Sequence, residues 1–358
     1  METILVTGGA GFIGSNFIRY TQNKFPDVKI VNIDLLTYAG NEANLENLPS
    51  PHMHLFIHDD ICNQIVVESL LRENKITKII HFAAETHVDR SLKEPKVFLK
   101  SNVYGTFHLL EAAKKVWLDE GLNQTNDVRF HHISTDEVYG SLSKQDPAFT
   151  EDTPYSPNSP YAASKASSDH LVRSYYKSFG LPVTISNCSN NYGPYQFPEK
   201  LIPFTIFNAL MDKPIPIYGD GQQIRDWLYV EDHCEAMWHV ILNGTVGESY
   251  NIGGDNQPAN LDIVRSICDI IDIKTNRPTP CSSLITHIND RPGHDRRYAM
   301  NIQKIKTHLG WKPKNNIQTG LEKTVEWYLG NQTWLLNIAQ NAEFKKWVKK
   351  NYQMRGSK

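Results

Sequence analysis

Short apolar runs alternate with longer stretches of helical period along the first half of the chain. Buried parallel strands are predicted at residues 4–7, 29–34, 55–59, 78–82 and 128–134. Helices are predicted at residues 12–24, 64–74, 97–117 and 161–179. Continuously apolar strands that alternate with helices are typical of a parallel sheet covered on both faces. The pattern therefore predicts an α/β protein with a doubly wound parallel sheet.

The pattern becomes irregular after about residue 190, where Pro and Gly cluster at residues 192–194, 214–216 and 219–221. We expect a larger nucleotide-binding domain over residues 1–190, to which residues 227–255 return. Residues 191–358 are expected to form mainly a smaller α/β substrate-binding domain. Further helices are predicted at residues 231–242, 261–271, 303–309 and 320–328, and in the basic tail after residue 343.

The composition is that of an ordinary folded protein of 358 residues, of which 40% are hydrophobic and 21% charged. Lys and Arg number 37 against 39 Asp and Glu. The resulting net charge of −2 provides no general field to attract nucleic acid or an anionic membrane. Neither is expected as a partner, and an anionic small molecule must be bound by a few local cations and backbone N–H groups.

Cysteine and histidine usage argues against disulfides and metal. The five cysteines are an odd number with no C-x-x-C pair. Neither the group His52, His54 and His58 nor the pair His131 and His132 has a spacing that specifies metal ligation, so no metal is predicted. The first residues show neither a basic n-region nor an apolar h-region, so no secretory leader is expected, and no run of 18 apolar residues occurs. A cytoplasmic location is expected.

A glycine-rich segment, T-G-G-A-G-F-I-G at residues 7–14, joins the first strand to the first helix. Gly8, Gly11 and Gly14 let the backbone turn sharply and approach a pyrophosphate, which a helix N-terminus attracts. Asp34 ends the second strand 20 residues after Gly14. Its carboxylate can bind the adenosine ribose and would repel a 2′-phosphate. NAD in a Rossmann-like domain is therefore predicted, and a tight turn beside a solvated Asp is the alternative.

Tyr161 and Lys165 are spaced i, i+4 on a predicted helix and share one face of it. A phenol with a pKa of about 10 is a poor base at neutral pH. A neighbouring ammonium and a nicotinamide cation would both favour the phenolate. Tyr161 is therefore the candidate base that removes a proton from a sugar hydroxyl, with Lys165 lowering its pKa and binding the nicotinamide ribose.

Seven segments resemble a known family: residues 7–14, 83–87, 134–139, 161–165, 190–193, 223–227 and 290–294. With them the chain resembles the extended short-chain dehydrogenase/reductases, and within these the dTDP-glucose 4,6-dehydratase family, over nearly its whole length. The run Thr135-Asp136-Glu137 is the most informative, because epimerases of the same fold need only the Ser/Thr and the Tyr–Lys pair. Ser141 departs from the family pattern, which more often has Asp there, at a position away from catalysis.

The resemblance implies a redox-neutral dehydration. Hydride passes from C4 of glucose to NAD, Glu137 removes the C5 proton, Asp136 protonates the departing C6 hydroxyl, and hydride returns to C6. Thr135 would hydrogen-bond the C4 oxygen. An acid role for Asp136 requires a pKa well above about 4, which burial beside Glu137 would promote. The alternative is two solvated loop carboxylates.

The resemblance also implies which residues bind the two ligands. Cofactor contacts are expected from Gly8, Gly11, Phe12, Ile13, Gly14, Asp34, Leu35, Thr37, Asp60, Ile61, Ala83, Ala84, Ser101, Tyr161, Lys165 and Asn191. Substrate contacts are expected from His87, Thr135, Asn190, Lys200, Leu201, Pro216, Ile217, Tyr218, Arg225, Asn260, Arg291 and His294. Each of the substrate residues has an ordinary alternative, such as a surface salt bridge between Arg225 and Asp226.

Two other functions compete with the dehydratase: an epimerase or decarboxylase of the same fold, and a non-catalytic NAD-binding regulator. Asp136 and Glu137 argue against the first, and an intact Tyr161–Lys165 pair argues against the second. By resemblance, helices at residues 97–117 and 161–179 pair across a homodimer as a helix bundle. The residues alone do not distinguish dTDP from UDP.

Overall fold

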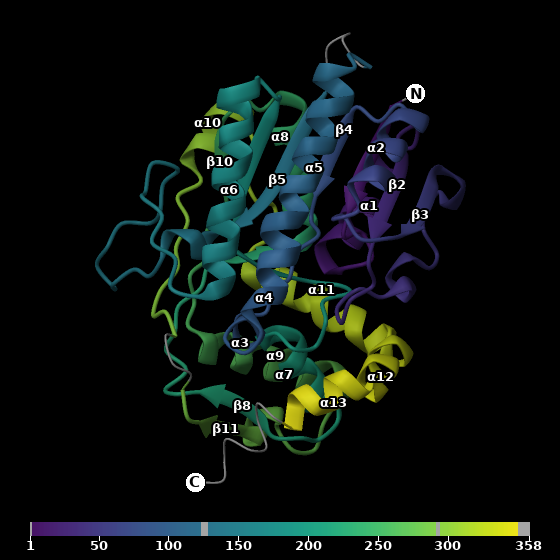
Figure 1. Cartoon of the computed structure of the whole chain (residues 1–358). Helices are drawn as coiled ribbons and strands as arrows, with labels where there is room; N and C mark the ends of the chain where they lie inside the picture. Colours follow the sequence, from purple (N-terminus) through teal and green to yellow (C-terminus); the bar gives the residue numbers. More distant parts are fainter. Residues whose placement is uncertain (1, 123–127, 291–293, 350–358) are drawn as a thin grey trace.

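The computed structural model describes residues 2–122, 128–290 and 294–349, and its larger lobe is built on a seven-stranded sheet (Figure 1). In sheet order the strands are β10 (Ser249–Ile252), β6 (Val183–Cys188), β5 (Arg129–Thr135), β4 (Lys78–His81), β1 (Thr3–Thr7), β2 (Lys29–Asp34) and β3 (His54–His58). Every pairing is parallel. The predicted doubly wound α/β class is confirmed. β6 and β10 were not predicted. Half of their residues are polar, so neither strand forms an apolar run in the sequence.

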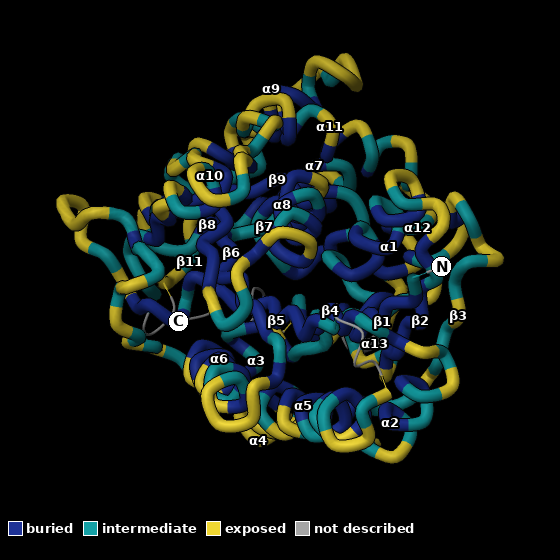
Figure 2. Tube along the Cα trace, turned by 90° about the horizontal axis from the view of Figure 1, so that it is seen from above, coloured by how far each residue is buried: buried dark blue, intermediate teal, exposed yellow. Residues whose placement is uncertain are grey.

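The two faces of the sheet are covered by different helices, as the view from above shows (Figure 2). Leu5 of β1 lies in a core with α2 (Gln64–Glu73), α5 (Gly105–Ala113) and α6 (Pro160–Phe179). Its neighbours Ile4 and Val6 lie in a second core with α1 (Phe12–Lys24) and α8 (Val230–Asn243). Since successive side chains of a strand alternate between faces, one apolar run supplies both cores.

The helical segment predicted at residues 97–117 is present but not uniform. It consists of α4 (Pro95–Phe98), a π-helical stretch η3 (Leu99–Tyr104), α5 and a second π-helical stretch η4 (Lys114–Asp119). A π turn bonds residue i to i+5, and a hydrophobic period does not reveal where such turns fall. The other three helices predicted in this half correspond to α1, α2 and α6.

The smaller lobe packs two short parallel pairs of strands against helices. β8 (Ile215–Tyr218) pairs with β11 (Ile285–Ile288), and β7 (Asn190–Tyr192) pairs with β9 (Trp227–Tyr229). The helices are α7 (Leu201–Leu210), α9 (Asn260–Thr275), α11 (Ile317–Gly330), α12 (Gln332–Gln340) and α13 (Ala342–Val348). Their apolar side chains form a third core.

Three later elements join the larger lobe. β10 is the edge strand next to β6, α8 covers the sheet, and Ile305 of α10 (Gln303–Leu309) packs in the same core as α8. The remaining short helices are α3 (Val88–Ser91), η1 (Glu42–Leu45), η2 (Pro51–Met53), η5 (Asp136–Tyr139) and η6 (Cys281–Leu284). Within the described ranges, no helix has the length and apolarity needed to cross a membrane.

Candidate active site

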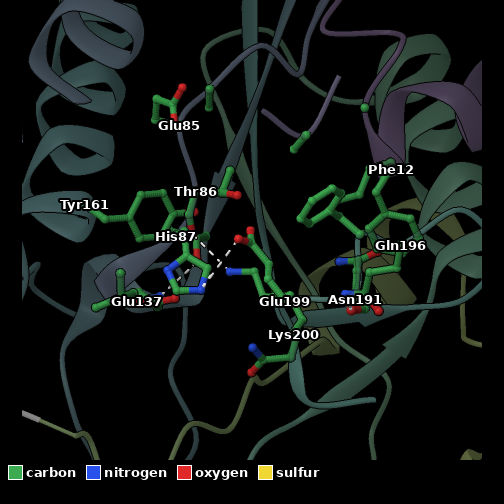
Figure 3. Close-up of a pocket in the computed structure, with 18 of the residues that line it drawn as sticks. Phe12, Glu85, Thr86, His87, Glu137, Tyr161, Asn191, Gln196, Glu199 and Lys200 are labelled. Carbon is green, nitrogen blue, oxygen red and sulfur yellow. Dashed lines mark hydrogen bonds and ion pairs between the residues drawn. The ribbon is translucent and has the colours of Figure 1, made fainter. Parts of the chain in front are cut away.

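A cavity of about 420 Å³ lies where the carboxyl ends of the central strands meet the smaller lobe. Residues of both lobes line it, and Figure 3 shows several of their side chains facing one another. Ligands of doubly wound folds bind at this edge of the sheet. Every predicted catalytic, cofactor and substrate residue that the structure describes lines the cavity. Arg291 lies outside the described residues, and the role assigned to each individual residue stays a prediction.

The glycine-rich loop between β1 and α1 forms a narrow cradle. Gly8 has a φ of +72°, and a Cβ built on it would lie 2.7 Å from the backbone of Ala83. A Cβ on Gly14 would lie 2.4 Å from the Gly8 carbonyl oxygen. Any side chain at either position would collide with backbone, whereas glycine leaves the start of α1 open to a phosphate. The loop therefore fits the pyrophosphate of a dinucleotide.

Asp34 holds this loop in place as well as facing the cavity. Its Oδ2 accepts a hydrogen bond from the Ala10 N–H (2.9 Å) and its Oδ1 accepts one from the Leu36 N–H (2.8 Å). Burial raises the pKa of Asp34, and the two backbone hydrogen bonds oppose this rise. A carboxylate has further lone pairs, so the predicted ribose contact is compatible with this bracing. Asn32, which accepts from the Gly9 N–H at 3.0 Å, is a second brace that the sequence motif does not identify.

Thr135 ends β5 and caps the short helix η5 that carries the two adjacent carboxylates. Its hydroxyl donates to Asp136 Oδ1 (3.2 Å) and accepts from the Glu137 N–H (3.3 Å). Asp136 is 1% exposed. Burial, followed by the nearby carboxylates of Glu137 and Asp226, raises the pKa of Asp136 well above its ordinary value. Burial therefore favours the protonated form of Asp136, which is the form that a general acid needs.

Asp136 also has an unused oxygen. Its Oδ2 is buried and has no hydrogen-bond partner among the described residues. A buried polar atom without a partner is costly and marks a place where a ligand can supply the bond. Glu137 acts on the pKa of Tyr161, and His87 lines the same cavity (Figure 3). A sugar bound there would meet an acid and a second carboxylate at once.

Tyr161 and Lys165 lie in the first turns of α6. The Ser159 hydroxyl accepts from the Ala162 N–H (3.1 Å), and Pro160 occupies the first helical position, which fixes where the helix begins. Burial and then the charge of Glu137 raise the pKa of Tyr161 well above its ordinary value. Lys165 donates to the Ile133 carbonyl (2.8 Å), and burial lowers its pKa to about 8. The phenolate of Tyr161 thus depends on nearby positive charge.

The arginine on the substrate side of the cavity is anchored by backbone. Arg225 is 5% exposed and donates to the carbonyls of Ile224 (2.7 Å) and Asp295 (2.8 Å). Its guanidinium lies 4.4 Å from the centre of the Tyr298 ring. The Asp226 carboxylate accepts from the Gly254 N–H at 2.7 Å, and burial raises its pKa to about 6. Arg225 is therefore a buried cation facing the cavity, not the exposed partner of Asp226 that the alternative supposed.

Other predicted substrate residues come from separate loops of the smaller lobe. Lys200 donates to the Thr86 carbonyl (3.1 Å), which ties the start of α7 to the loop after β4. His294 pairs with Asp290 at 2.6 Å. Asn190 and Asn260 each present a buried Oδ1 that has no partner within the described part of the chain. These oxygens can accept hydrogen bonds from a ligand's hydroxyl or N–H groups.

Three predicted substrate residues belong to β8, an edge strand of the two-stranded sheet that it makes with β11. Pro216, Ile217 and Tyr218 pair in parallel with β11, and all three line the cavity with Leu201 of α7. Ile217 is buried. This wall offers an apolar surface to a flat ring, as a nucleobase pocket requires.

A buried acid, Glu199, was missed by the sequence motifs. Its Oε1 accepts from the Tyr38 hydroxyl at 2.9 Å, and its Oε2 lies 3.8 Å from His87 Nε2 and 3.7 Å from Arg90 Nε. Burial raises the pKa of Glu199 to about 7. Figure 3 shows Glu199 and His87 facing each other in the cavity. Its position directly before Lys200 is the only signal that sequence offers.

The glycine cradle, the Tyr161–Lys165 pair and the carboxylates at the end of β5 share one cavity in a doubly wound fold. Together they define the class of NAD-dependent extended short-chain dehydrogenases/reductases. No cluster of three or more His, Cys, Asp or Glu side chains able to hold a metal ion occurs among the described residues.

Comparison with known proteins narrows the class. A family model described as GDP-mannose 4,6 dehydratase matches residues 5–324. The dTDP-glucose 4,6-dehydratase of Salmonella typhimurium is 51% identical over 360 residues, covering 98% of this chain and 99% of that protein. This chain belongs to the dTDP-glucose 4,6-dehydratase family.

Solved structures of dTDP-glucose 4,6-dehydratases have the same fold as this chain. The dTDP-glucose 4,6-dehydratase of Bacillus anthracis, solved in complex with NAD, is 43% identical, with a TM-score of 0.83 over 94% of this chain and 100% of that one. The dTDP-glucose 4,6-dehydratase of Streptomyces venezuelae, solved with NAD and TYD bound, is 42% identical, with a TM-score of 0.84 over 94% of this chain and 99% of that one.

Proposed function

We propose that this chain is an NAD-dependent hydro-lyase that converts dTDP-glucose to dTDP-4-dehydro-6-deoxy-glucose. The observation that carries the proposal is the pair of adjacent carboxyl groups, buried Asp136 and half-buried Glu137, in the same cavity as Tyr161 and Lys165. An epimerase needs one base for one hydroxyl. A dehydratase needs a further acid and a further base, and this cavity holds both.

NAD would be held by the glycine cradle, Asp34, Lys165 and the residues near Asp60. The cradle fits the pyrophosphate of NAD because Gly8 and Gly14 leave no room for a side chain. When bound, NAD supplies a reversible acceptor for the hydride that leaves C4 and returns to C6. Lys165, lying one helical turn from Tyr161, supplies positive charge that favours the phenolate and a donor for the nicotinamide ribose.

The protein's own residues then act in sequence. Tyr161 takes the proton of the C4 hydroxyl, while Thr135 hydrogen-bonds the oxygen that becomes a ketone. The ketone makes the C5 hydrogen acidic, and Glu137 removes it. Asp136, kept protonated by burial, gives its proton to the C6 hydroxyl, which leaves as water. Return of the proton to C5 completes a reaction with no net oxidation.

The nucleotide would lie on the smaller lobe. Arg225 and Lys200 supply positive charge toward the diphosphate, since a guanidinium can bind two phosphate oxygens at once. Asn190 and Asn260 offer unpaired oxygens, and the β8 wall faces the base. Arg291 and His294 complete the predicted set.

A direct assay tests this function. The purified protein is incubated with dTDP-glucose, and the product is measured by the ultraviolet absorbance that a 4-keto-6-deoxy sugar develops in alkali. We expect that absorbance to appear without a lasting rise in NADH. A C4 epimer as the product would instead favour the epimerase.

A homodimer and a cytoplasmic location belong to the same proposal. Leu99, Tyr104 and Phe107 on η3 and α5 and Phe179 on α6 are exposed apolar side chains, 36–61% accessible. A patch of this kind on two adjacent helices suits a helix-bundle interface. Light scattering on the purified protein tests it, and Tyr104→Glu should shift mass toward the monomer. All five cysteines are free, as expected in a reducing compartment.

A further inference from the structure

A row of buried polar groups lies next to Lys165, and its other members, His132 and Asp169, do not line the cavity. Lys165 Nζ is 3.3 Å from Nε2 of His132, on β5. The same Nε2 is 3.2 Å from Oδ1 of Asp169, one helical turn beyond Lys165 on α6. His132 and Asp169 are completely buried and Lys165 is 4% exposed. An ammonium and a carboxylate are thus joined through one imidazole nitrogen, out of contact with solvent.

One nitrogen cannot serve both neighbours in the same way. If Nε2 is unprotonated it accepts from the Lys165 ammonium, and if it is protonated it donates to Asp169. His132 Nδ1 is buried and has no partner among the described residues, so the ring's polar contacts are made through Nε2 alone. Burial and then the charge of Lys165 lower the pKa of His132 to about 4, so the ring is neutral near pH 7. The charges of this group are therefore carried by Lys165 and Asp169, and His132 between them is neutral.

Asp169 is held as an anion. Its Oδ2 accepts from the Ser134 hydroxyl (2.8 Å) and from the Tyr155 hydroxyl (2.8 Å), and Arg173 lies over the Tyr155 ring at 5.2 Å. Burial opposes ionisation, but the adjacent His132, the charge of Lys165 and the hydrogen bond from Ser134 outweigh it and lower the pKa of Asp169. A fully buried carboxylate kept ionised in this way needs a nearby cation. Lys165 is that cation.

We propose that Asp169, acting through His132, is a positioning residue that supplies the counter-charge keeping Lys165 an ammonium next to Tyr161. This deepens the proposed function and rests on it, because it concerns the same Tyr161–Lys165 pair. His132 fixes the separation of the two charges and the direction of the Lys165 amine. Asp169 contacts neither the sugar nor the cofactor in this account, since it does not line the cavity.

The other titratable groups around Lys165 do not replace this charge. Cys188 on β6 has its pKa raised to about 12 by burial, so its thiol is neutral. His81 on β4, whose ring lies 5.2 Å from that of His132, has its pKa lowered well below the ordinary value by burial. Burial raises the pKa of Asp136 and so favours its neutral form, and the charge of Glu137 acts on Tyr161. Among the described residues that act on Lys165, Asp169 is the ionised carboxylate.

The role predicts two separate changes when the charge of Asp169 is removed. The active form of the pair is a Tyr161 phenolate beside a Lys165 ammonium, one proton fewer than the fully protonated pair. A nearby anion stabilises the fully protonated, positive pair, so Asp169→Asn should let the first proton leave at lower pH. Asn also leaves the ammonium without a counter-charge, so the remaining proton stays more often on Tyr161. In the pH profile of kcat/KM, the acid limb should therefore move to lower pH, and the value on the plateau should fall.

The test is the pH dependence of kcat/KM with dTDP-glucose, measured on the NAD-loaded protein. For Asp169→Asn we expect the acid limb to move down by about one pH unit and the plateau to fall by about 10-fold or more, as loss of an opposite charge at this range implies. The matched control is Asp232→Asn, another buried aspartate, which accepts from the Lys314 and Asn315 N–H groups. The control should keep the wild-type acid limb.

A second pair of variants carries the test if Asp169→Asn does not fold. In His132→Gln the amide oxygen can accept from Lys165 and the amide nitrogen can donate to Asp169, so the profile should stay within about 3-fold of wild type. His132→Leu removes the bridge and should change limb and plateau in the same directions as Asp169→Asn.

The outcomes separate this proposal from the proposed function. Turnover of dTDP-glucose by the wild type decides the function before any variant is made. With that established, a lowered plateau at an unchanged acid limb in Asp169→Asn, or equal profiles for His132→Gln and His132→Leu, would overturn the role of Asp169.

Discussion

The end of β5 and the smaller lobe bring different kinds of polar group to the same cavity. At the end of β5, Asp136 and the neighbouring Tyr161 and Lys165 have pKa values that burial moves far from the ordinary ones. On the smaller lobe, Arg225 carries a charge that does not titrate, and backbone carbonyls hold it in place. The comparison teaches that the three groups proposed to exchange protons sit beside the carboxyl end of β5, on η5 and α6. The fixed charge of Arg225 sits on a loop of the smaller lobe, where we propose that the nucleotide binds.

The largest effect should come from removing both carboxylates of η5. Asp136→Asn with Glu137→Gln deletes an acid and a base, each worth about 10²- to 10⁴-fold, so loss of water should fall by about 10⁴-fold or more. Oxidation at C4 should remain measurable as NADH absorbance, because Tyr161 and Lys165 are untouched.

The chain offers a matched control for this pair. Glu231 and Asp232 are adjacent acids at the start of α8, and Asp232 is buried, with 3% exposure against 1% for Asp136. Glu231→Gln with Asp232→Asn should keep the dehydration rate. Full dehydration by the η5 double variant would remove the distinction between the two regions.

Tyr161→Phe should have the next largest effect. It removes the base for the C4 hydroxyl, and kcat should fall by about 10²- to 10⁴-fold with little change in KM. The control is Tyr250→Phe, which removes another buried phenol, one that accepts from the Thr245 N–H at 3.0 Å. If kcat for Tyr161→Phe stays near wild type, the base lies elsewhere.

A change on the smaller lobe should alter binding more than chemistry. Arg225→Met removes the proposed charged donor to phosphate, worth about 1.5–3 kcal/mol, which corresponds to an expected rise in KM of about 10- to 100-fold. We expect kcat to change by less than about 5-fold, because the proposed contact of Arg225 with phosphate is the same before and during reaction. Steady-state kinetics with dTDP-glucose measure both. A fall in kcat at constant KM would place Arg225 with the reacting groups.

The smallest effect concerns stability in acid. Burial between Thr184 and Ser186 on the sheet holds the pKa of His131 well below 6.5. Below about pH 6.5, His131 binds a proton in the unfolded chain but stays neutral in the folded protein. The free energy of unfolding therefore falls as pH falls, by up to about 1.4 kcal/mol for each unit of difference between the two pKa values. His131→Gln should reduce this loss between pH 7.5 and 5 in urea unfolding. Exposed His52→Gln should not, and an equal loss in both variants would refute the assignment.

The sequence predicted the scaffold well because local patterns decide it. Five of the seven strands and the covering helices follow from apolar runs and helical period, and the glycine spacing at residues 7–14 identifies the nucleotide loop. The π turns of η3 and η4 were not predicted, since they depend on how the helix packs and not on its composition. The strands β6 and β10 were missed because half their residues are polar although all are buried.

Site residues that belong to a sequence motif were predicted. Site residues that only the fold brings together were missed. Tyr161 and Lys165 are four residues apart, so one helix brings them together. Asp169 and His132 are 37 residues apart, and their contact depends on how α6 lies on β5. Glu199 is a similar case, because its partner Tyr38 lies in the loop after β2, 161 residues earlier in the sequence.

The central claim is that one cavity moves hydride from C4 to C6 while Asp136 and Glu137 remove water between. It is tested most directly with dTDP-glucose that carries deuterium at C4. We predict a 4-keto-6-deoxy product whose deuterium is found at C6, with none released to solvent and no lasting NADH. Deuterium retained at C4, or lost from the sugar, would contradict the account.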